Sequence, residues 1–179
     1  MMTHIANSLS FEEIKKLEFP FFLDERGGFG RIFCDEKLLD SGIVFNTSQV
    51  NLAYTKKKGT VRGMHFQTKP FPESKIIKCI SGKIFDVVVD IRPESDSYLK
   101  YEINIMSESD NHSIYVPYGF AHGYQTLDDD VKVVYIHNVR YSQAYQGGIN
   151  PNDPKLDIPW PLKITTISER DSSIPFLNS

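Results

Sequence analysis

Short strand-like segments follow one another through the middle of the chain, from residue 43 to residue 138. They are rich in β-branched and apolar residues, and turn sequences such as Ser81-Gly82 and Asp128-Asp-Asp130 separate them. Short strands at regular spacing with turns between them are typical of a β-sandwich or β-barrel. The expected strands cover residues 43–50, 75–80, 83–91, 101–106, 113–116 and 131–138. The sequence therefore predicts an all-β fold with a few short peripheral helices.

Two of these segments flank the Ser81-Gly82 turn, and we expect residues 75–80 and 83–91 to pair as a hairpin. The stretch 85–91, Phe-Asp-Val-Val-Val-Asp-Ile, is nearly continuous in apolar residues, as in a strand that is buried on both faces. Residues 101–106 alternate between apolar and polar side chains, which predicts a strand that is half-exposed.

The segments outside this β-rich region carry other local signals. Ser10 as an N-cap and Glu13 in a capping box predict a short helix over residues 10–17. Residues 23–30 are polar and Gly-rich, and we expect a loop there, whereas residues 35–42 predict one or two helical turns closed by Gly42. After residue 145 the chain is expected to be mostly loop packed over the β core. We expect one domain over residues 1–179, with residues 1–18 as an N-terminal extension or a dimer arm.

Charge and composition narrow the classes of partner. The 179 residues carry a formal net charge of −3 with scattered Lys and Arg, which argues against binding to nucleic acid and favours a small ligand. No apolar run approaches the roughly 20 residues of a membrane span, and we see no signal peptide. Cys34 and Cys79 lack the spacing of a disulfide framework or a zinc site. We therefore expect a cytoplasmic protein without membrane contact.

Two segments are similar to the metal-binding halves of a cupin, a small jelly-roll barrel: Gly59–Gln67 and Pro117–His122. The metal form needs a His-x-His pair on alternate residues of a strand, and here Gln67 stands where the second histidine would be. Phosphate-binding glycine loops and nucleophile elbows are also missing from the sequence. We therefore expect a cupin-type jelly roll that holds no metal.

A further set of motifs extends along the chain from about residue 20, and their order and spacing are specific together. They are Asp24-Glu-Arg-Gly27, Gln49-Val-Asn51, Val61–Gln67, Lys75–Cys79, Gly82–Arg92, Pro117–Tyr124, Tyr135 and Asp157-Ile-Pro-Trp-Pro161. This set resembles the dTDP-4-dehydrorhamnose 3,5-epimerase family. The resemblance implies a cofactor-free, homodimeric enzyme that epimerises C3 and C5 of a nucleoside-diphosphate 4-keto-6-deoxy sugar.

The chemistry implied by the resemblance needs three kinds of group. A 4-keto group acidifies the hydrogens at C3 and C5 because the carbanion delocalises onto O4 as an enolate, so a base, an acid on the opposite face and a stabilising charge at O4 are required. The family pattern implies that His65 is the base and that Asp171 orients it. It implies that Tyr135 is the acid, that Lys75 lies beside the enolate oxygen and that His122 contacts the sugar near O4.

The resemblance also implies residues that bind the rest of the substrate. Arg62 and Arg26 match positions that hold the diphosphate, for which a planar guanidinium is well suited. Gln49 and Asn51 match polar contacts to the substrate. Without the resemblance, these side chains would be interpreted as ordinary surface or strand residues.

Two positions depart from the family pattern. Arg31 replaces a glutamate that contacts the nucleotide, and Arg140 stands where the family has a tyrosine that stacks on the thymine ring. An arginine can stack on a base but prefers different edge contacts. A dTDP sugar is the first expectation, and CDP- and GDP-linked 4-keto sugars are alternatives.

Other functions stay open at the level of sequence. The same residues would serve an epimerase that acts at C3 or C5 only. A 3,4-ketoisomerase on a related barrel would use a different histidine cluster, and a non-catalytic sugar-nucleotide-binding jelly roll would need no base. His4, His112 and His137 match no catalytic position, and we expect them to be structural or exposed.

Overall fold

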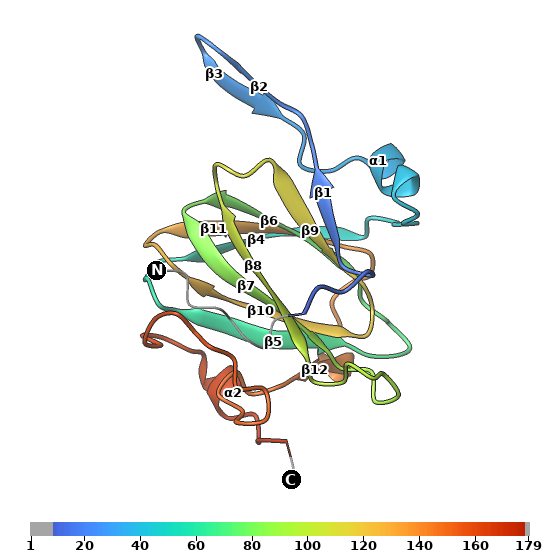
Figure 1. The fold of residues 1–179 in the computed structure, drawn as a ribbon, viewed down its shortest axis with the longest axis vertical. Helices are drawn as coiled ribbons and strands as arrows, with labels where there is room; N and C mark the ends of the chain where they lie inside the picture. The colour runs from blue at the N-terminus through green and yellow to red at the C-terminus, as the bar shows by residue number, and fades with distance from the viewer. Residues whose placement is uncertain (1–8, 178–179) are drawn as a thin grey trace.

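The computed structural model describes residues 9–177, which form two five-stranded antiparallel sheets and a separate hairpin (Figure 1). The first sheet has the strand order β1-β9-β6-β11-β4 and the second the order β12-β5-β10-β7-β8. The strands of the first sheet are β1 (Lys15–Glu18), β9 (His112–Val116), β6 (Lys75–Ser81), β11 (Val131–His137) and β4 (Gln49–Thr55). Those of the second are β12 (Gln146–Gly148), β5 (Val61–Gln67), β10 (Phe120–Thr126), β7 (Lys83–Asp90) and β8 (Tyr101–Ser107). The predicted all-β jelly roll is confirmed.

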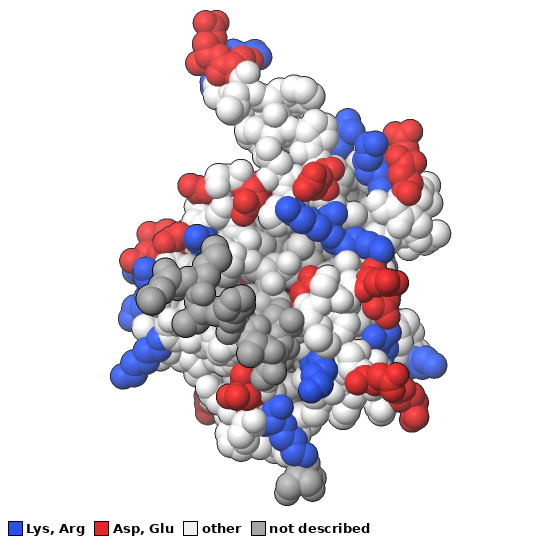
Figure 2. Space-filling model, viewed as in Figure 1, with Lys and Arg blue, Asp and Glu red and all other residues white. Residues whose placement is uncertain are grey.

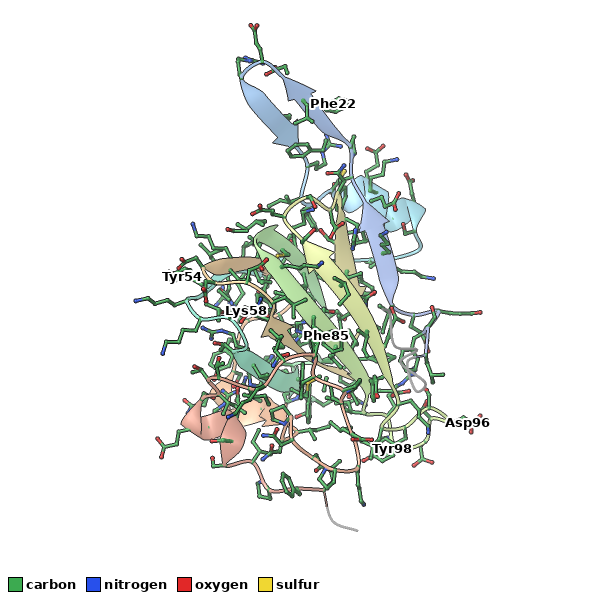
Figure 3. The ribbon with its side chains drawn as sticks, turned by 60° about the vertical axis from the view of Figure 1, so that its left-hand side comes forward. Phe22, Tyr54, Lys58, Phe85, Asp96 and Tyr98 are labelled. Carbon is green, nitrogen blue, oxygen red and sulfur yellow. The ribbon has the colours of Figure 1, made fainter. Side chains whose placement is uncertain are left out.

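The strand β7 is buried on both faces, as its apolar run predicts. One face places Ile84 and Val88 in a core shared with the inner face of the first sheet. The other face packs against the C-terminal segment, where the rings of Phe85 and Trp160 meet edge to face with centroids 5.9 Å apart. Figure 3 shows Phe85 inside the body of the molecule. The C-terminal region therefore covers the outer face of the second sheet, as expected.

The hairpin expected around Ser81-Gly82 is wrong, because β6 and β7 belong to different sheets. The strand β6 pairs with β9 and β11, whereas β7 pairs with β8 and β10. Gly82 adopts a φ of +73°, which suits a glycine, and the turn carries the chain from one sheet to the other. Both strands have an apolar inner face, so the crossover buries both against one core. A local turn signal is the same for a hairpin and for this crossover.

The helix expected over residues 10–17 is also wrong. Instead, β1 pairs with β9 along the edge of the first sheet, and the side chains of Phe11 and Leu17 are buried. Glu13 does not form a capping box, since its carboxylate accepts a hydrogen bond from Arg92 at 2.9 Å. A helix of this length is marginal in isolation, and pairing with the sheet buries more apolar surface. Residues 1–8 lie outside the described part of the chain.

The Gly-rich segment 23–30 forms most of a β-hairpin rather than a loop. The strands β2 (Phe21–Asp24) and β3 (Gly27–Gly30) pair with each other and project from the body (Figures 1 and 3). The tip of the hairpin is charged and its stem is uncharged (Figure 2). The stem exposes Phe22, Leu23 and Phe29, which are 67–81% accessible.

The connection between this hairpin and β4 is partly as expected. The helix α1 spans Asp35–Asp40, and Gly42 follows it with a φ of +77°, so the predicted helical turns are confirmed. The strand expected from residue 43 begins only at Gln49. Ile43 and Phe45 are buried beside α1 in an irregular segment, so their apolar character reflects a side core and not a strand. Within residues 9–177, no helix has the length and apolar character to cross a membrane.

Candidate active site

A pocket of about 680 Å³ lies between the two sheets, beside the C-terminal segment. Its walls come from β4, β6 and β11 of the first sheet and from β5 and β10 of the second. The structure brings together the following residues that the sequence suggested: Asn51, Arg62, His65, Lys75, His122, Tyr135 and Asp171. They come from segments that are far apart in the chain.

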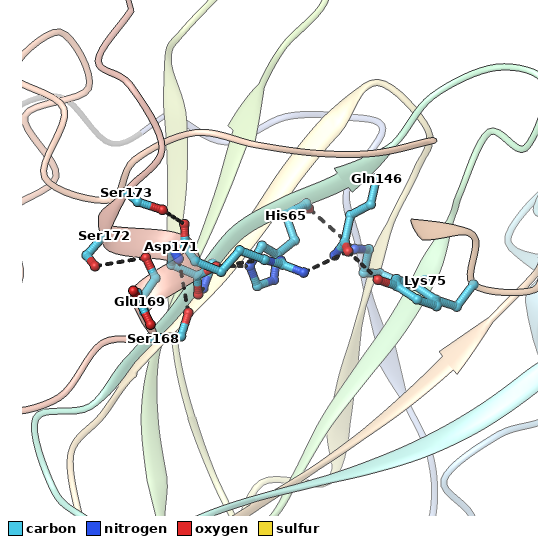
Figure 4. Close-up of polar contacts among 11 residues, drawn as sticks. His65, Lys75, Gln146, Ser168, Glu169, Asp171, Ser172 and Ser173 are labelled. Carbon is cyan, nitrogen blue, oxygen red and sulfur yellow. Dashed lines mark hydrogen bonds and ion pairs between the residues drawn. The ribbon is translucent and has the colours of Figure 1, made fainter. Parts of the chain in front are cut away.

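On the second sheet, a histidine–carboxylate pair forms one wall. His65 on β5 lies with its Nε2 2.7 Å from Oδ1 of Asp171, which belongs to the short helix α2 (Glu169–Ser172) (Figure 4). The side chain of Ser168 caps this helix by accepting the backbone N–H of Asp171, and Gly63 donates its N–H to the Asp171 carboxylate. These contacts fix the carboxylate in place.

Burial alone would raise the pKa of Asp171, but the hydrogen bond and charge of His65 outweigh it and hold that pKa at about 2. The carboxylate is therefore ionised at neutral pH and acts only as an acceptor. In the neutral form of His65, Nε2 must then carry the hydrogen, and the lone pair lies on Nδ1. A histidine held in this tautomer is suited to act as a base.

Gly63 allows the close approach of β5 and β10 beside this pair. Its φ is +119°, and a Cβ there would lie 2.6 Å from the Cα of Gly123 and 2.7 Å from the carbonyl oxygen of His122. Only glycine fits this position without displacing the backbone. The two strands then pair with His65 opposite His122, so both histidines reach the same pocket.

His122 has a carboxylate partner of its own. Its Nε2 lies 2.5 Å from Oδ1 of Asp86 on β7, and both side chains are buried. Burial lowers the pKa of His122, with Asp86 opposing the shift. Oδ2 of Asp86 has no hydrogen-bond partner among the described residues. Asp86 was not among the site residues predicted from the sequence, although a carboxylate in a strand buried on both faces requires a polar partner.

Tyr135 faces the pocket from the opposite sheet, on β11. Its ring stacks on that of His137 (centroids 5.8 Å apart, 13° between the planes) and meets the edge of His122 at 5.8 Å. Removal from water raises the pKa of Tyr135 well above its ordinary value of 10.0. The phenol is therefore protonated at neutral pH, and it lies on the opposite wall from His65.

Lys75 on β6 belongs to the same wall as Tyr135 and is buried. Its Nζ lies 2.6 Å from Oε2 of Glu73 and 3.5 Å from the carbonyl oxygen of His65. Glu73 also accepts from Nδ1 of His137 at 2.8 Å. Glu73 was not predicted from the sequence, and His137 was expected to be structural or exposed. His137 lines the pocket, and its position two residues after Tyr135 on a strand already indicates the same face.

The expected substrate-binding residues separate into two groups. Arg62 lines the pocket and is held by Thr55 Oγ1 at 2.8 Å and by a backbone carbonyl, and Asn51 also lines it. Gln49 lies at the start of β4 and accepts the backbone N–H of Tyr141. Gln49 does not line the pocket itself, but it holds the backbone of Tyr141, which does.

The other three arginines suggested by the sequence, Arg26, Arg31 and Arg140, do not line this pocket. Arg26 is at the tip of the hairpin, where it pairs with Asp24 at 2.5 Å, and Arg31 follows the hairpin near Cys34. Arg140 is exposed and contributes only its backbone carbonyl, which accepts from Gln67. Spacing in the sequence cannot predict which side chain faces the pocket once the strand β11 has ended.

Tyr141, not Arg140, lines the pocket. Its hydroxyl donates to Gln146 at 2.8 Å, and Gln146 also accepts from Arg170 at 2.8 Å. Gln146 and Arg170 were not predicted from the sequence. No local pattern marks them, because each reaches the pocket only through the folding of the C-terminal segment.

Gln67, which replaces the second histidine of the cupin motif, serves the loop that follows β11. Its amide donates to the carbonyl oxygens of Phe71 and Arg140, and its Oε1 accepts the N–H of Ser142. In the part of the chain that the structure describes, no three His, Cys, Asp or Glu side chains are grouped so as to hold a metal ion.

Comparisons with known proteins give one family. The model of the dTDP-4-dehydrorhamnose 3,5-epimerase family matches residues 8–179. A dTDP-4-dehydrorhamnose 3,5-epimerase from Sinorhizobium fredii is 39% identical over 95% of this chain and 88% of its own length.

Solved structures agree in fold. The dTDP-4-dehydrorhamnose 3,5-epimerase of Bacillus anthracis, with TDP and PPi bound, superposes with a TM-score of 0.90 at 35% identity, covering 95% of this chain and 97% of the other. A 3'-monoepimerase from Streptomyces bikiniensis, in complex with dTDP-quinovose, superposes with a TM-score of 0.87 at 32% identity, covering 95% and 86%.

Proposed function

The chain belongs to the dTDP-4-dehydrorhamnose 3,5-epimerase family and is an isomerase, and we propose that it inverts C3 and C5 of a dTDP-linked 4-keto-6-deoxy sugar. The observation that carries the proposal is the placement of two proton-transfer groups on opposite walls of one pocket. His65 is held by Asp171 on the second sheet, and Tyr135 faces it from the first. Inversion at carbon needs this opposition, because the proton leaves one face and another arrives on the other.

In the proposed mechanism, Nδ1 of His65 takes the proton from C3 or C5, and the electron pair of that C–H bond moves onto O4 as an enolate. The ammonium of Lys75 stabilises this charge, assisted by the His122–Asp86 pair. When the enolate collapses, the carbon accepts the phenol proton of Tyr135 from the other face. Each inverted carbon thus loses one proton and gains one, and the protein groups recover theirs by exchange with water.

The nucleotide is assigned to the outer part of the pocket. Arg62 is proposed to bind the diphosphate, and the ring of Tyr141 is proposed to stack on the base, a role expected from the sequence for Arg140. Asn51 and Gln49 support this region.

We propose that the protein acts as a homodimer, because Arg26 lies outside the pocket of its own chain. The hairpin that carries it exposes Phe22, Leu23 and Phe29, and the edge strand β4 beside the pocket exposes Val50 and Leu52. Apolar surface of this kind is typical of a protein–protein interface. If the hairpin covers the pocket edge of a second copy, the diphosphate contact comes from the partner. We also propose that the protein is cytoplasmic, as expected from the sequence.

A single-site epimerase is the second candidate. The similarity to a 3'-monoepimerase, at an identity close to that of the Bacillus anthracis 3,5-epimerase, favours it as the alternative. The same base and acid would serve one carbon or two, because the outcome depends on how the sugar turns between steps.

Incubation of dTDP-, CDP- and GDP-linked 4-keto-6-deoxy sugars in deuterated buffer tests the proposal by mass spectrometry. We expect two carbon-bound deuterons in the dTDP substrate and slower exchange in the other two. One deuteron would make the protein a single-site epimerase, and faster exchange in the CDP or GDP sugar would change the nucleoside. An absence of exchange in all three would contradict catalysis and support a sugar-nucleotide-binding protein.

A further inference from the structure

A second carboxylate is built into the pocket, on the wall opposite Asp171. Glu73 bridges two side chains, with Oε2 2.6 Å from Nζ of Lys75 and Oε1 2.8 Å from Nδ1 of His137. All three side chains line the pocket, yet each is at most 12% accessible. The bridge therefore joins Lys75 on β6 to its register partner His137 on β11.

The charge of Glu73 is maintained by its two partners. Burial would raise the pKa of its carboxyl, but the hydrogen bond from His137 and the charge of Lys75 bring that pKa down to about 2. A carboxylate with this pKa is ionised throughout the physiological range, so it accepts from both partners and donates to neither. Lys75 is consequently anchored by an ion pair with little access to solvent.

His137, which is held by Glu73, in turn supports the ring of Tyr135. Nδ1 of His137 contacts Glu73, and on the other side of the ring Nε2 lies 3.4 Å from the amide nitrogen of Asn51. The ring is thus held at two points, and its face stacks on Tyr135 with 13° between the planes. His122 meets the same phenol ring from another direction, edge to face.

We propose that Glu73 and His137 are positioning residues for the acid wall of this pocket: Glu73 fixes the Lys75 ammonium and the His137 ring, and His137 fixes the ring of Tyr135. The inference rests on the proposed function, because Glu73 would hold Lys75 beside the enolate and, through His137, would hold the acid Tyr135 for reprotonation. A lysine stem is flexible, and an anchored ammonium still has a donor to offer the substrate. A displacement of about 1 Å of such a group costs on the order of 100-fold in rate.

Glu73→Gln tests the anchor. The amide keeps the size of the side chain but loses the charge, so Lys75 is held less firmly. We expect kcat to fall roughly 10- to 100-fold with KM changed less than about 3-fold, because the loss concerns the transition state and not binding. Deuterium exchange and inversion should fall together, since both pass through the enolate that Lys75 stabilises.

Two substitutions of His137 separate its contacts. In His137→Asn the amide nitrogen can replace Nδ1 toward Glu73, but the ring that supports Tyr135 is lost. In His137→Phe a ring remains beside Tyr135, but the bond to Glu73 is lost. We expect His137→Asn to raise the ratio of deuterium exchange to inversion about 10-fold, because a poorly placed acid lets His65 return a deuteron to the original face. For His137→Phe we expect a ratio close to that of the wild type with a lower kcat.

The matched control is Glu13→Gln, which removes a carboxylate from an ion pair with Arg92 outside this pocket. It should leave kcat, KM and the exchange ratio unchanged. The melting temperature of each variant is measured first, and if Glu73→Gln does not fold, the ratio for His137→Asn decides alone. Folded variants that keep the wild-type kcat and ratio would overturn the inference and leave the proposed function intact. A wild type that exchanges no hydrogen would overturn both.

Discussion

The two walls of the pocket hold their reactive side chains in different ways. On the second sheet, the carboxylate of Asp171 orients the single side chain of His65, which is 29% accessible. On the first sheet, the carboxylate of Glu73 is shared by Lys75 and His137, both nearly inaccessible. A base must exchange its proton with water between turnovers, whereas an ammonium that stabilises an enolate acts best in a dry, fixed position. The difference in exposure between His65 and Lys75 therefore fits their roles.

The first and largest test of this division is His65→Asn, which removes the base but leaves the other wall intact. We expect both solvent exchange and epimerisation to fall by roughly 10⁴-fold, because the group that takes the proton from carbon is lost. Substrate affinity, measured by calorimetry, should change little. Exchange that persists within about 10-fold of the wild-type rate would assign the base to another residue.

Tyr135→Phe breaks the opposite wall while keeping the ring between His137 and His122. We expect the rate of net inversion to fall by about 10³-fold, because the enolate loses its proton source on that face. Product formation is followed by NMR of the sugar ring protons. Full inversion activity in this variant would mean that another donor, such as ordered water, supplies the proton.

Asp171→Asn has a smaller expected effect, since the base stays in place. The amide can donate to Nε2 of His65 and so favours the tautomer whose Nδ1 carries the hydrogen, which lowers kcat by roughly 100-fold. The pH dependence of kcat/KM should also change relative to the wild type. An unchanged kcat would show that Asp171 does not determine the tautomer.

The smallest predicted effect concerns stability, and it compares the carboxylates of the two walls. Their pKa values are depressed to about 2 from ordinary values of 3.8 for Asp171 and 4.5 for Glu73. Each group stabilises the folded state above its ordinary pKa, and the contribution, about 2–3 kcal/mol, is lost as the pH falls toward 2. Urea unfolding between pH 6 and about 2.5 should show a shallower loss in Asp171→Asn and in Glu73→Gln than in the wild type. Parallel curves would contradict the pKa assignments.

The sequence predicted the β class because short apolar segments leave a local signal, as in β7. It did not predict the partner of each strand: the turn at Gly82 is compatible with a hairpin, but the shared core placed β6 and β7 in different sheets. Residues 10–17 likewise carried a helix signal that pairing with β9 overrode.

The candidate site shows the same limit. His65, Lys75, His122 and Tyr135 were found because motif order marks them, and the structure places them in one pocket. Glu73 became visible only when β6 and β11 paired, since its role depends on a neighbour in space. The position of Arg26 outside the pocket of its own chain follows from a hairpin that composition alone did not indicate.

The stereochemistry of deuterium incorporation in Tyr135→Phe is the decisive test of whether the two walls act on opposite faces of the sugar. With the 4-keto sugar in deuterated buffer, we expect deuterium to enter C3 or C5 with retention, because His65 still removes a proton and returns a deuteron on its own face. His65→Asn, measured in parallel, should incorporate none. Deuterium that enters Tyr135→Phe mainly with inversion would contradict the assignment of Tyr135 as the acid, because the first sheet would then supply a deuteron without its tyrosine.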